Sequence, residues 1–396
     1  MTGALGEKLT VLSAAAEFDA CAECSPRASR DVRDLISPSI TRLHLPRAGC
    51  LSVLKVLQTN ACEYDCLYCA NRAERRCRRY ALKPEDLAAG FADLHARGIV
   101  NGLFLSSGIN GSAAATMARM IDTVEIIRTR YDFRGYVHLK VLPGAPYDCI
   151  ERAVLLADRL SVNVEAPTQQ ALDHLSTRKH LYSDVIQRMH WIRRAAQQAG
   201  EGVLRSGQTT QFVIGAAGES DRETLNAVEG LRRSVGLRRA YFSAFSPIGD
   251  TPLADEPPAP ALRQHRLYQA DWLLREYGFH LGDLVFDETG NLPMETDPKL
   301  AFAARNPQLF PIEVNRASRA DLLRVPGIGP RSAARILAAR ARGRLTSVDD
   351  LRNLGVPASR AAPFLLIDGR PGGDPARILS RRTRASQLGL PLACSA

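Results

Sequence analysis

The stretch Asn60-Ala-Cys62-Glu-Tyr-Asp-Cys66-Leu-Tyr-Cys69-Ala-Asn-Arg72 contains three cysteines in the spacing C-x3-C-x2-C. It follows an apolar run, Leu51 to Leu57, which predicts the first buried strand of a parallel sheet. We therefore expect the three thiols in a loop at the carboxyl end of that strand. Open α/β sheets and barrels carry their chemistry at this end.

The number of cysteines in this loop helps to distinguish a zinc site from an iron-sulfur cluster. A structural zinc ion takes four protein ligands, commonly in closely spaced pairs, and this loop offers three with unequal spacing. A [4Fe-4S] cluster is normally held by four cysteines, so three leave one iron open. A zinc site, or three unrelated buried cysteines, are the alternatives to such a cluster.

The cysteine loop resembles that of the radical S-adenosylmethionine (radical SAM) superfamily. The resemblance includes Tyr68, which matches the aromatic residue before the last cysteine. It implies that Cys62, Cys66 and Cys69 bind a [4Fe-4S] cluster whose open iron chelates S-adenosylmethionine (SAM). It also implies that an electron from the cluster cleaves SAM to give a 5′-deoxyadenosyl radical.

Apolar, β-rich runs alternate with amphipathic segments from Leu51 to about Phe245. The strands we expect are 52–58, 102–106, 136–141, 160–165, 209–214 and 240–245. The helices we expect between them are 84–97, 114–130, 146–158, 183–199 and 220–235. Repeated strand–helix alternation requires right-handed crossovers and a parallel sheet. The predicted fold class is α/β, a partial (βα)6 TIM-like barrel, which is also the fold of the radical SAM enzymes that the chain resembles.

Two of the predicted strands end in polar residues that are candidates for holding SAM. The second ends in Ser106-Ser107-Gly108, where glycine permits close approach of a ligand and the hydroxyls can bond it. Superfamily members often have Gly-Gly-Glu there, so the sequence departs from the pattern. By resemblance to the strand-four ribose motif, Asn163 and Glu165 would contact SAM. An interior polar cluster that only packs the barrel mouth is the alternative.

A second motif lies near the C-terminus, in Val325-Pro-Gly327-Ile328-Gly329-Pro330. It separates a short predicted helix, 319–324, from a second one, 331–342, and this is a helix-hairpin-helix (HhH) pattern. The glycines permit a tight turn, and the N–H groups that start the second helix can face a phosphate. The predicted DNA-binding residues are Gly327, Ile328, Gly329, Arg331 and Ser332. Residues 345–360 look like a degenerate second copy, so we expect a small all-α (HhH)2 domain. A motif used only for protein interaction or packing is the alternative.

The net charge of +10 is concentrated in the same part of the chain. Residues 312–396 contain 15 arginines, no lysine and 6 acidic residues, whereas the first 311 residues carry 37 basic and 36 acidic groups. This asymmetry indicates a polyanionic partner for the C-terminal part. An arginine-rich solvated surface without a partner would show the same composition.

The domain boundaries that we predict are an N-terminal extension (1–50), the partial barrel (51–246), a linker with a connecting helix (247–311), the (HhH)2 domain (312–370) and a flexible basic tail (371–396). The sequence shows no signal peptide and no membrane span, so we expect a cytoplasmic protein.

Nine cysteines in a reducing compartment indicate metal sites or free thiols. Cys21, Cys24, Cys50 and Cys77 are candidates for an additional metal, with free thiols as the simpler interpretation.

The combination of a radical SAM barrel with an HhH pair resembles the family of DNA modification and repair radical SAM proteins, over roughly residues 7–370. The resemblance implies a [4Fe-4S] enzyme that acts on DNA, with a uracil-DNA-glycosylase-like protein as partner and an electron donor. Two alternatives stay open: a radical SAM enzyme that modifies RNA or protein, and a non-enzymatic Fe-S scaffold that binds DNA.

Overall fold

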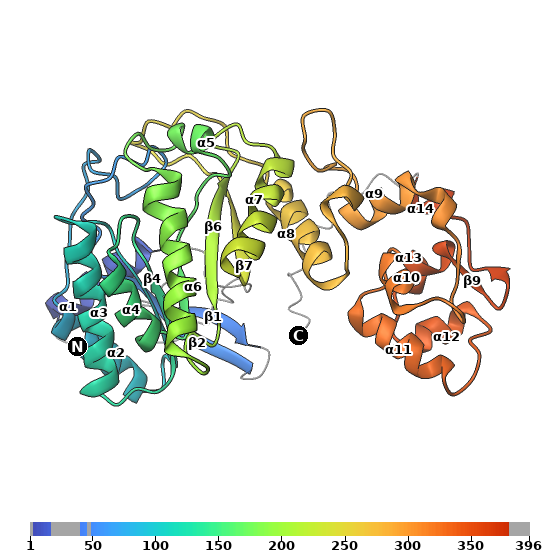
Figure 1. Cartoon of the computed structure of the whole chain (residues 1–396), viewed down its shortest axis with the longest axis horizontal. Helices are drawn as coiled ribbons and strands as arrows, with labels where there is room; N and C mark the ends of the chain where they lie inside the picture. The colour runs from blue at the N-terminus through green and yellow to red at the C-terminus, as the bar shows by residue number, and fades with distance from the viewer. Residues whose placement is uncertain (1–2, 17–39, 46–48, 380–396) are drawn as a thin grey trace. The chain divides into compact units, whose positions relative to one another are not determined.

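The structure is a computed structural model that describes residues 3–16, 40–45 and 49–379 (Figure 1). Contacts within the chain divide it into two compact units. Within the part of the chain that the structure describes, the first unit runs to Glu219 and includes Asn226–Ala259, and the second comprises Ser220–Leu225 together with residues 260–379. Among the described residues, no helix is both long and apolar enough to cross a membrane.

A curved seven-stranded sheet forms the centre of the first unit, and helices cover its outer face (Figure 1). Its strands are β1 (Ile40–Leu45), β2 (Gly49–Leu57), β3 (Gly102–Ser106), β4 (Tyr136–Lys140), β5 (Arg159–Ser161), β6 (Gln208–Ile214) and β7 (Arg239–Ala244). Each strand pairs with its neighbour in sequence, and β2 to β7 are all parallel. The six-stranded partial barrel is confirmed.

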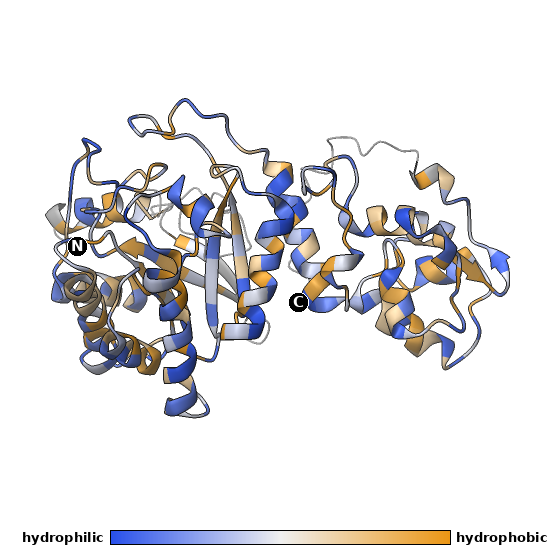
Figure 2. Ribbon diagram, turned by 45° about the horizontal axis from the view of Figure 1, so that its top comes forward, coloured by the Kyte–Doolittle hydropathy of each residue, from blue (hydrophilic) through white to orange (hydrophobic). Residues whose placement is uncertain are grey.

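The helices between the parallel strands include the five that the sequence predicts and a short one, Gln169–Asp173, that it does not. They are α2 (Pro84–Ala96), α3 (Ala113–Thr129), α4 (Tyr147–Leu156), α5 (Gln169–Asp173), α6 (Gln187–Ala199) and α7 (Asp221–Val235); α1 (Gly3–Ala14) precedes the sheet. Proline opens α2, where its missing N–H costs nothing, and the Ser112 hydroxyl caps α3. The helices carry both hydrophilic and hydrophobic residues (Figure 2), because one side packs on the sheet and the other faces water.

The structure differs from the sequence prediction mainly around β1 and β5. The antiparallel strand β1 was not predicted, and it pairs along β2 from Ile40 to Leu45. β5 ends at Ser161 instead of continuing to Glu165. Glu165 adopts a left-handed backbone conformation (φ 67°), which an extended strand cannot contain, and rejoins the sheet through one bridge to Phe212.

The second unit is mainly helical. Its longer elements are α8 (Ala261–Glu276), α9 (Pro298–Arg305), α10 (Arg319–Arg324), α11 (Pro330–Arg340) and α12 (Val348–Asn353), and its short helices are α13 (Ala358–Ala361) and α14 (Ala376–Leu379). The predicted all-α domain also contains a small sheet of β8 (Ile312–Glu313), β9 (Leu365–Ile367) and β10 (Arg370–Pro371). Leu300 and Ala303 of α9 belong to the same core as Leu322 and Ile336. Part of the stretch predicted as a linker therefore packs with the HhH helices.

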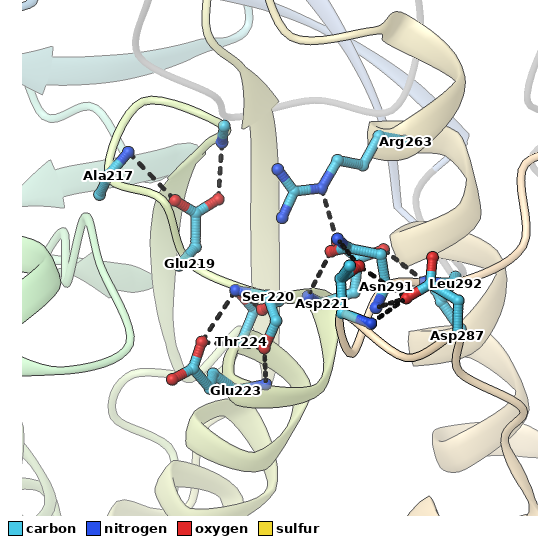
Figure 3. A network of polar contacts seen from close by, with 12 residues as sticks. Ala217, Glu219, Ser220, Asp221, Glu223, Thr224, Arg263, Asp287, Asn291 and Leu292 are labelled. Atoms are coloured by element: carbon cyan, nitrogen blue, oxygen red, sulfur yellow. Dashed lines mark hydrogen bonds and ion pairs between the residues drawn. The ribbon is translucent and has the colours of Figure 1, made fainter.

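An ion pair between Asp221 and Arg263 links three segments of the second unit (Figure 3). The Asp221 side chain is fully buried and accepts hydrogen bonds from Arg263 Nε at 2.8 Å and from the Leu292 backbone N–H at 2.9 Å. The Asp221 backbone N–H donates to Asn291 Oδ1 at 3.1 Å. One carboxylate thus joins the start of α7 to α8 and to the loop before α9.

We predict that Asp221→Asn lowers the free energy of unfolding of this unit by about 3 kcal/mol, because it removes the buried charge that the half-buried Arg263 guanidinium pairs with. Urea unfolding followed by circular dichroism measures the change. Asp132→Asn is the matched control, since Asp132 pairs with Arg134 at the surface, where both side chains are more than three-quarters exposed. An equal effect of the two substitutions would contradict the prediction.

Candidate functional site

A cavity opens at the carboxyl ends of the parallel strands in the first unit. It is lined by all nine residues that the sequence nominated for the cluster and SAM: Cys62, Cys66, Tyr68, Cys69, Ser106, Ser107, Gly108, Asn163 and Glu165. Side chains that the sequence did not nominate also line it, among them Tyr64, Lys179, Gln211 and Ser243. Lys140, at the end of β4, lies there too.

Backbone hydrogen bonds hold the cysteine loop against the end of β3. The Glu63 N–H donates to the Ile109 carbonyl at 2.8 Å, and the Ile109 N–H points to Cys62 Sγ at 3.5 Å. On the other side, the Leu67 N–H donates to the Leu175 carbonyl at 2.8 Å. Backbone hydrogen bonds therefore hold the loop at two points, next to Cys62 and next to Cys66.

Gly108 allows this close approach. A Cβ atom built on Gly108 would lie 2.5 Å from the carbonyl oxygen of Ala61 and 3.1 Å from Cβ of Cys62. Its N–H donates to the Thr59 carbonyl at 2.8 Å. The sequence pattern favoured a glycine that a ligand approaches, whereas in the structure this glycine makes room for the backbone of the cysteine loop.

The Asp65 carboxylate fastens the middle of the cysteine loop. It accepts hydrogen bonds from the Ser176 and Thr177 hydroxyls, at 2.5 and 2.6 Å, and from the Thr177 N–H at 2.9 Å. Burial alone would raise the pKa of Asp65, but these hydrogen bonds outweigh it and the pKa is lowered. The carboxylate stays ionised at neutral pH and ties the loop to the segment after α5.

The thiols occupy surroundings that disfavour their charged form. Burial raises the pKa of the Cys66 thiol, and it raises that of Cys69 to about 12. Without metal these sulfurs keep their protons, so binding of iron must displace them. In the described part of the chain, no three His, Cys, Asp or Glu side chains are grouped to hold a single ion. A four-iron cluster, which bonds each cysteine to a different iron, does not require such grouping.

Lys179 is the main residue at the cavity that sequence reasoning missed. Its Nζ lies 3.5 Å from Glu165 Oε1, and both side chains are less than one-tenth exposed. Burial alone would lower the pKa of Lys179, but its interactions with Cys66 and Glu165 raise it. Lys179 comes from a loop after α5, away from any strand end, so its sequence position carried no signal.

The other polar candidates lie around this buried ion pair. Burial, and after it the charge of Glu165, raises the pKa of Tyr68 well above its ordinary value. Ser106 and Asn163 are buried, and the Ser107 hydroxyl donates to the Gly108 carbonyl at 2.7 Å. Glu165 also has a left-handed backbone conformation, which is uncommon for residues other than glycine.

In the second unit, α10 and α11 form the predicted hairpin. Gly327 has φ 86°, and Gly329 is the N-cap of α11, followed by Pro330. Arg331 is exposed and Ser332 half-buried in the first turn, while Ile328 is buried. Burial lowers the pKa of Lys299 well below its ordinary value, and the Lys299 amine donates to the Ile328 carbonyl. The hairpin is thus braced from α9.

The degenerate second copy is shorter than the first. Ser347 caps α12 through a capping box with Asp350, and Gly355 takes the left-handed conformation (φ 68°). The helix that follows, α13, has only four residues. This copy therefore adds packing to the domain but no second long helix with exposed N–H groups.

Of the candidates for an additional metal, the structure describes only the side chain of Cys77. Cys21, Cys24 and the side chain of Cys50 lie outside the described residues. Cys77 lies near the cavity with its Sγ 4.0 Å from the Ala70 carbonyl oxygen.

We predict that Gly108→Ala displaces the cysteine loop, since backbone atoms, which cannot rotate away, occupy the space of the new methyl group. We expect a loss of about 1–3 kcal/mol in stability and reduced iron uptake during reconstitution. Gly230→Ala in α7 is the control, because nothing lies within 4 Å of its added Cβ. Iron uptake equal to that of the control would contradict the role given to Gly108.

Two family comparisons match parts of the chain. The radical SAM superfamily matches residues 56–230, and a helix-hairpin-helix motif matches residues 310–355. A search of curated proteins gives no match. Radical SAM enzymes use a [4Fe-4S] cluster and SAM.

Several solved structures resemble the chain. HydG, a maturase of the [FeFe]-hydrogenase, has 13% identity and a TM-score of 0.44, over 55% of this chain and 48% of HydG. Methylornithine synthase (PylB) has 15% identity and a TM-score of 0.44, over 55% of this chain and 60% of PylB. The radical SAM methyltransferase TsrM from Kitasatospora setae has 13% identity and a TM-score of 0.39, over 54% of this chain and 48% of TsrM. The chain thus spans about half the length of the structures that it matches.

The family match includes the cysteine loop and all nine residues nominated for the cluster and SAM, and the motif match covers the hairpin of α10 and α11. Residues 56–230 are therefore similar to the radical SAM superfamily, and residues 310–355 to a helix-hairpin-helix motif.

Proposed function

We propose that this protein is a radical SAM enzyme that acts on DNA, by modification of a nucleotide or repair of a lesion. The observation that carries the proposal is the convergence of three cysteines and six SAM-contact candidates on one cavity. The HhH hairpin in the same chain supports DNA as the substrate.

In this proposal Cys62, Cys66 and Cys69 hold the cluster. The donor set fits, because three cysteines leave one iron open for SAM. Lys179 places a buried positive charge beside Cys66, which favours the thiolate needed for iron binding. When bound, the cluster and SAM supply reductive cleavage of the sulfonium to a 5′-deoxyadenosyl radical.

The remaining lining residues orient SAM and keep water out. The Glu165 carboxylate and the Asn163 amide can accept hydrogen bonds from ribose hydroxyls or the methionine amine, and Ser106 and Ser107 can bond the same cofactor. The Tyr68 ring and the backbone at Gly108 complete the contact surface. Lys179 holds Glu165 in place through its ion pair.

The hairpin residues Gly327, Ile328, Gly329, Arg331 and Ser332 bind the DNA backbone in this proposal. The first-turn N–H groups of α11 point out of an eleven-residue helix, and Arg331 adds positive charge. Such contacts position the enzyme without selecting a sequence. A base inside a duplex cannot reach a cavity at the barrel mouth, so the target nucleotide is single-stranded or flipped out.

We propose an electron donor and a uracil-DNA-glycosylase-like protein as further partners, on the family resemblance alone. Modification of RNA or protein is the second candidate function, because the cavity itself does not select a macromolecule.

We predict that anaerobically reconstituted protein forms 5′-deoxyadenosine from SAM and a reductant, and does so faster with DNA. Cys66→Ala should abolish this product. Cys149→Ala is the matched control, because Cys149 is also a buried free cysteine but lies in α4, away from the cavity. If the protein binds iron but forms no 5′-deoxyadenosine under any condition, the proposed enzyme activity is contradicted. A non-enzymatic Fe-S scaffold would then be the better account.

We also predict that Arg331→Ala weakens binding to duplex DNA equally for all sequences. Because the variant would neutralise one phosphate fewer, the slope of log K against log salt should fall by about 0.9. Arg344→Ala is the control, an exposed arginine of the same unit that pairs with Asp368. Equal slopes for the two variants would argue against the hairpin as the DNA-binding element.

A further inference from the structure

The loop that follows the third cysteine carries an unusual concentration of positive charge. Between Ala70 and Tyr80 it contains Arg72, Arg75, Arg76, Arg78 and Arg79 against one acid, Glu74. The first 311 residues are otherwise nearly neutral. We call residues 70–80 the arginine loop.

Two of these arginines build the loop itself. Arg79 donates hydrogen bonds to four backbone carbonyls, those of Asn60, Asn71, Arg72 and Arg75, at 2.6–2.9 Å. Arg75 donates to the Ala70 carbonyl at 3.1 Å and to the Gly249 carbonyl at 3.2 Å. The arginine loop is therefore a fixed structure, held by its inward-facing guanidinium groups.

The end of the loop runs in extended form alongside the residues after β2. The Asn60 N–H donates to the Tyr80 carbonyl at 3.2 Å, and Thr59 forms a bridge with Ala81. Alternate side chains of an extended segment point in opposite directions. Cys77 and Arg79 accordingly face the protein, while Arg76 and Arg78 are exposed.

The exposed arginines, Arg76 and Arg78, form at most weak interactions with the rest of the protein. The Arg78 side chain is 82% exposed and lies 3.4 Å from Glu7, which is itself 57% exposed. A surface pair of this kind contributes little free energy, so a phosphate can replace it. An arginine whose role was packing would instead be buried along its stem.

The arginine loop begins at the rim of the cavity that we propose holds the cofactor. Ala70 and Asn71, at its start, line the cavity, and so does Ile248, next to the Gly249 that Arg75 contacts. A phosphate chain that delivers a nucleotide to the cavity would pass this rim.

We propose that Arg76 and Arg78 bind the phosphates of a single DNA strand and guide it to the cavity, an inference that rests on the proposed function. In this proposal the HhH hairpin and the arginine loop bind different parts of the DNA. The hairpin contacts backbone phosphates of the duplex, and the arginine loop contacts the strand that has left it. Guanidinium groups suit this role because they bond phosphate oxygens in pairs.

The test compares binding of a labelled single-stranded oligonucleotide and of its duplex by full-length protein, over a range of salt concentrations and without SAM. The double variant Arg76→Glu/Arg78→Glu should weaken single-strand binding about tenfold or more. It should also reduce the salt slope by about 1.4, because each of the two arginines would neutralise one phosphate, at about 0.7 per phosphate of a single strand. Duplex binding should change much less.

Arg130→Glu/Arg134→Glu is the charge-matched control. Both residues are exposed, and they precede β4, at the end of the sheet opposite the cavity. If the two double variants weaken single-strand binding equally, the effect is one of net charge and the proposal is wrong. Wild-type protein that binds neither form of DNA would instead overturn the proposed DNA function, and with it this inference.

Discussion

The site depends on the contact between the cysteine loop and the end of β3. Two backbone segments meet at Gly108 with no room for a methyl group, and hydrogen bonds around Ile109 keep them together. This contact sets the positions of the cysteines, because their loop has no regular secondary structure of its own. The parallel sheet in turn places the ends of its strands, with their polar residues, around the same opening.

The charged groups in the cavity determine which ligand it can bind. The cavity combines buried thiols with one buried ion pair, Lys179 and Glu165. Burying an isolated charge is costly, so these groups are stable only when paired or when they bind a ligand. Thiolates bound to iron offer Lys179 a permanent negative neighbour, which is one reason to regard this cavity as built for a cluster. Outside the cavity, positive charge accumulates on the arginine loop and on the C-terminal unit.

Much of this was predictable from local pattern. Strand–helix alternation predicted six parallel strands, and the position of Cys62, Cys66 and Cys69 after the first of them predicted a loop at the carboxyl end of the sheet, where the structure has a cavity. Lys179 and the left-handed Glu165 were not predictable, because tertiary contacts between distant loops create their roles. The short strands β8 to β10 were missed for a similar reason, since two or three residues show no periodicity.

The central claim is that three cysteines hold a four-iron cluster with one iron open to SAM. Electron paramagnetic resonance of the reduced, reconstituted protein tests it directly, with and without SAM. The account predicts a [4Fe-4S] signal that changes when SAM is added, since SAM would bind the open iron. A signal that SAM leaves unchanged, or iron bound as single ions, would contradict it.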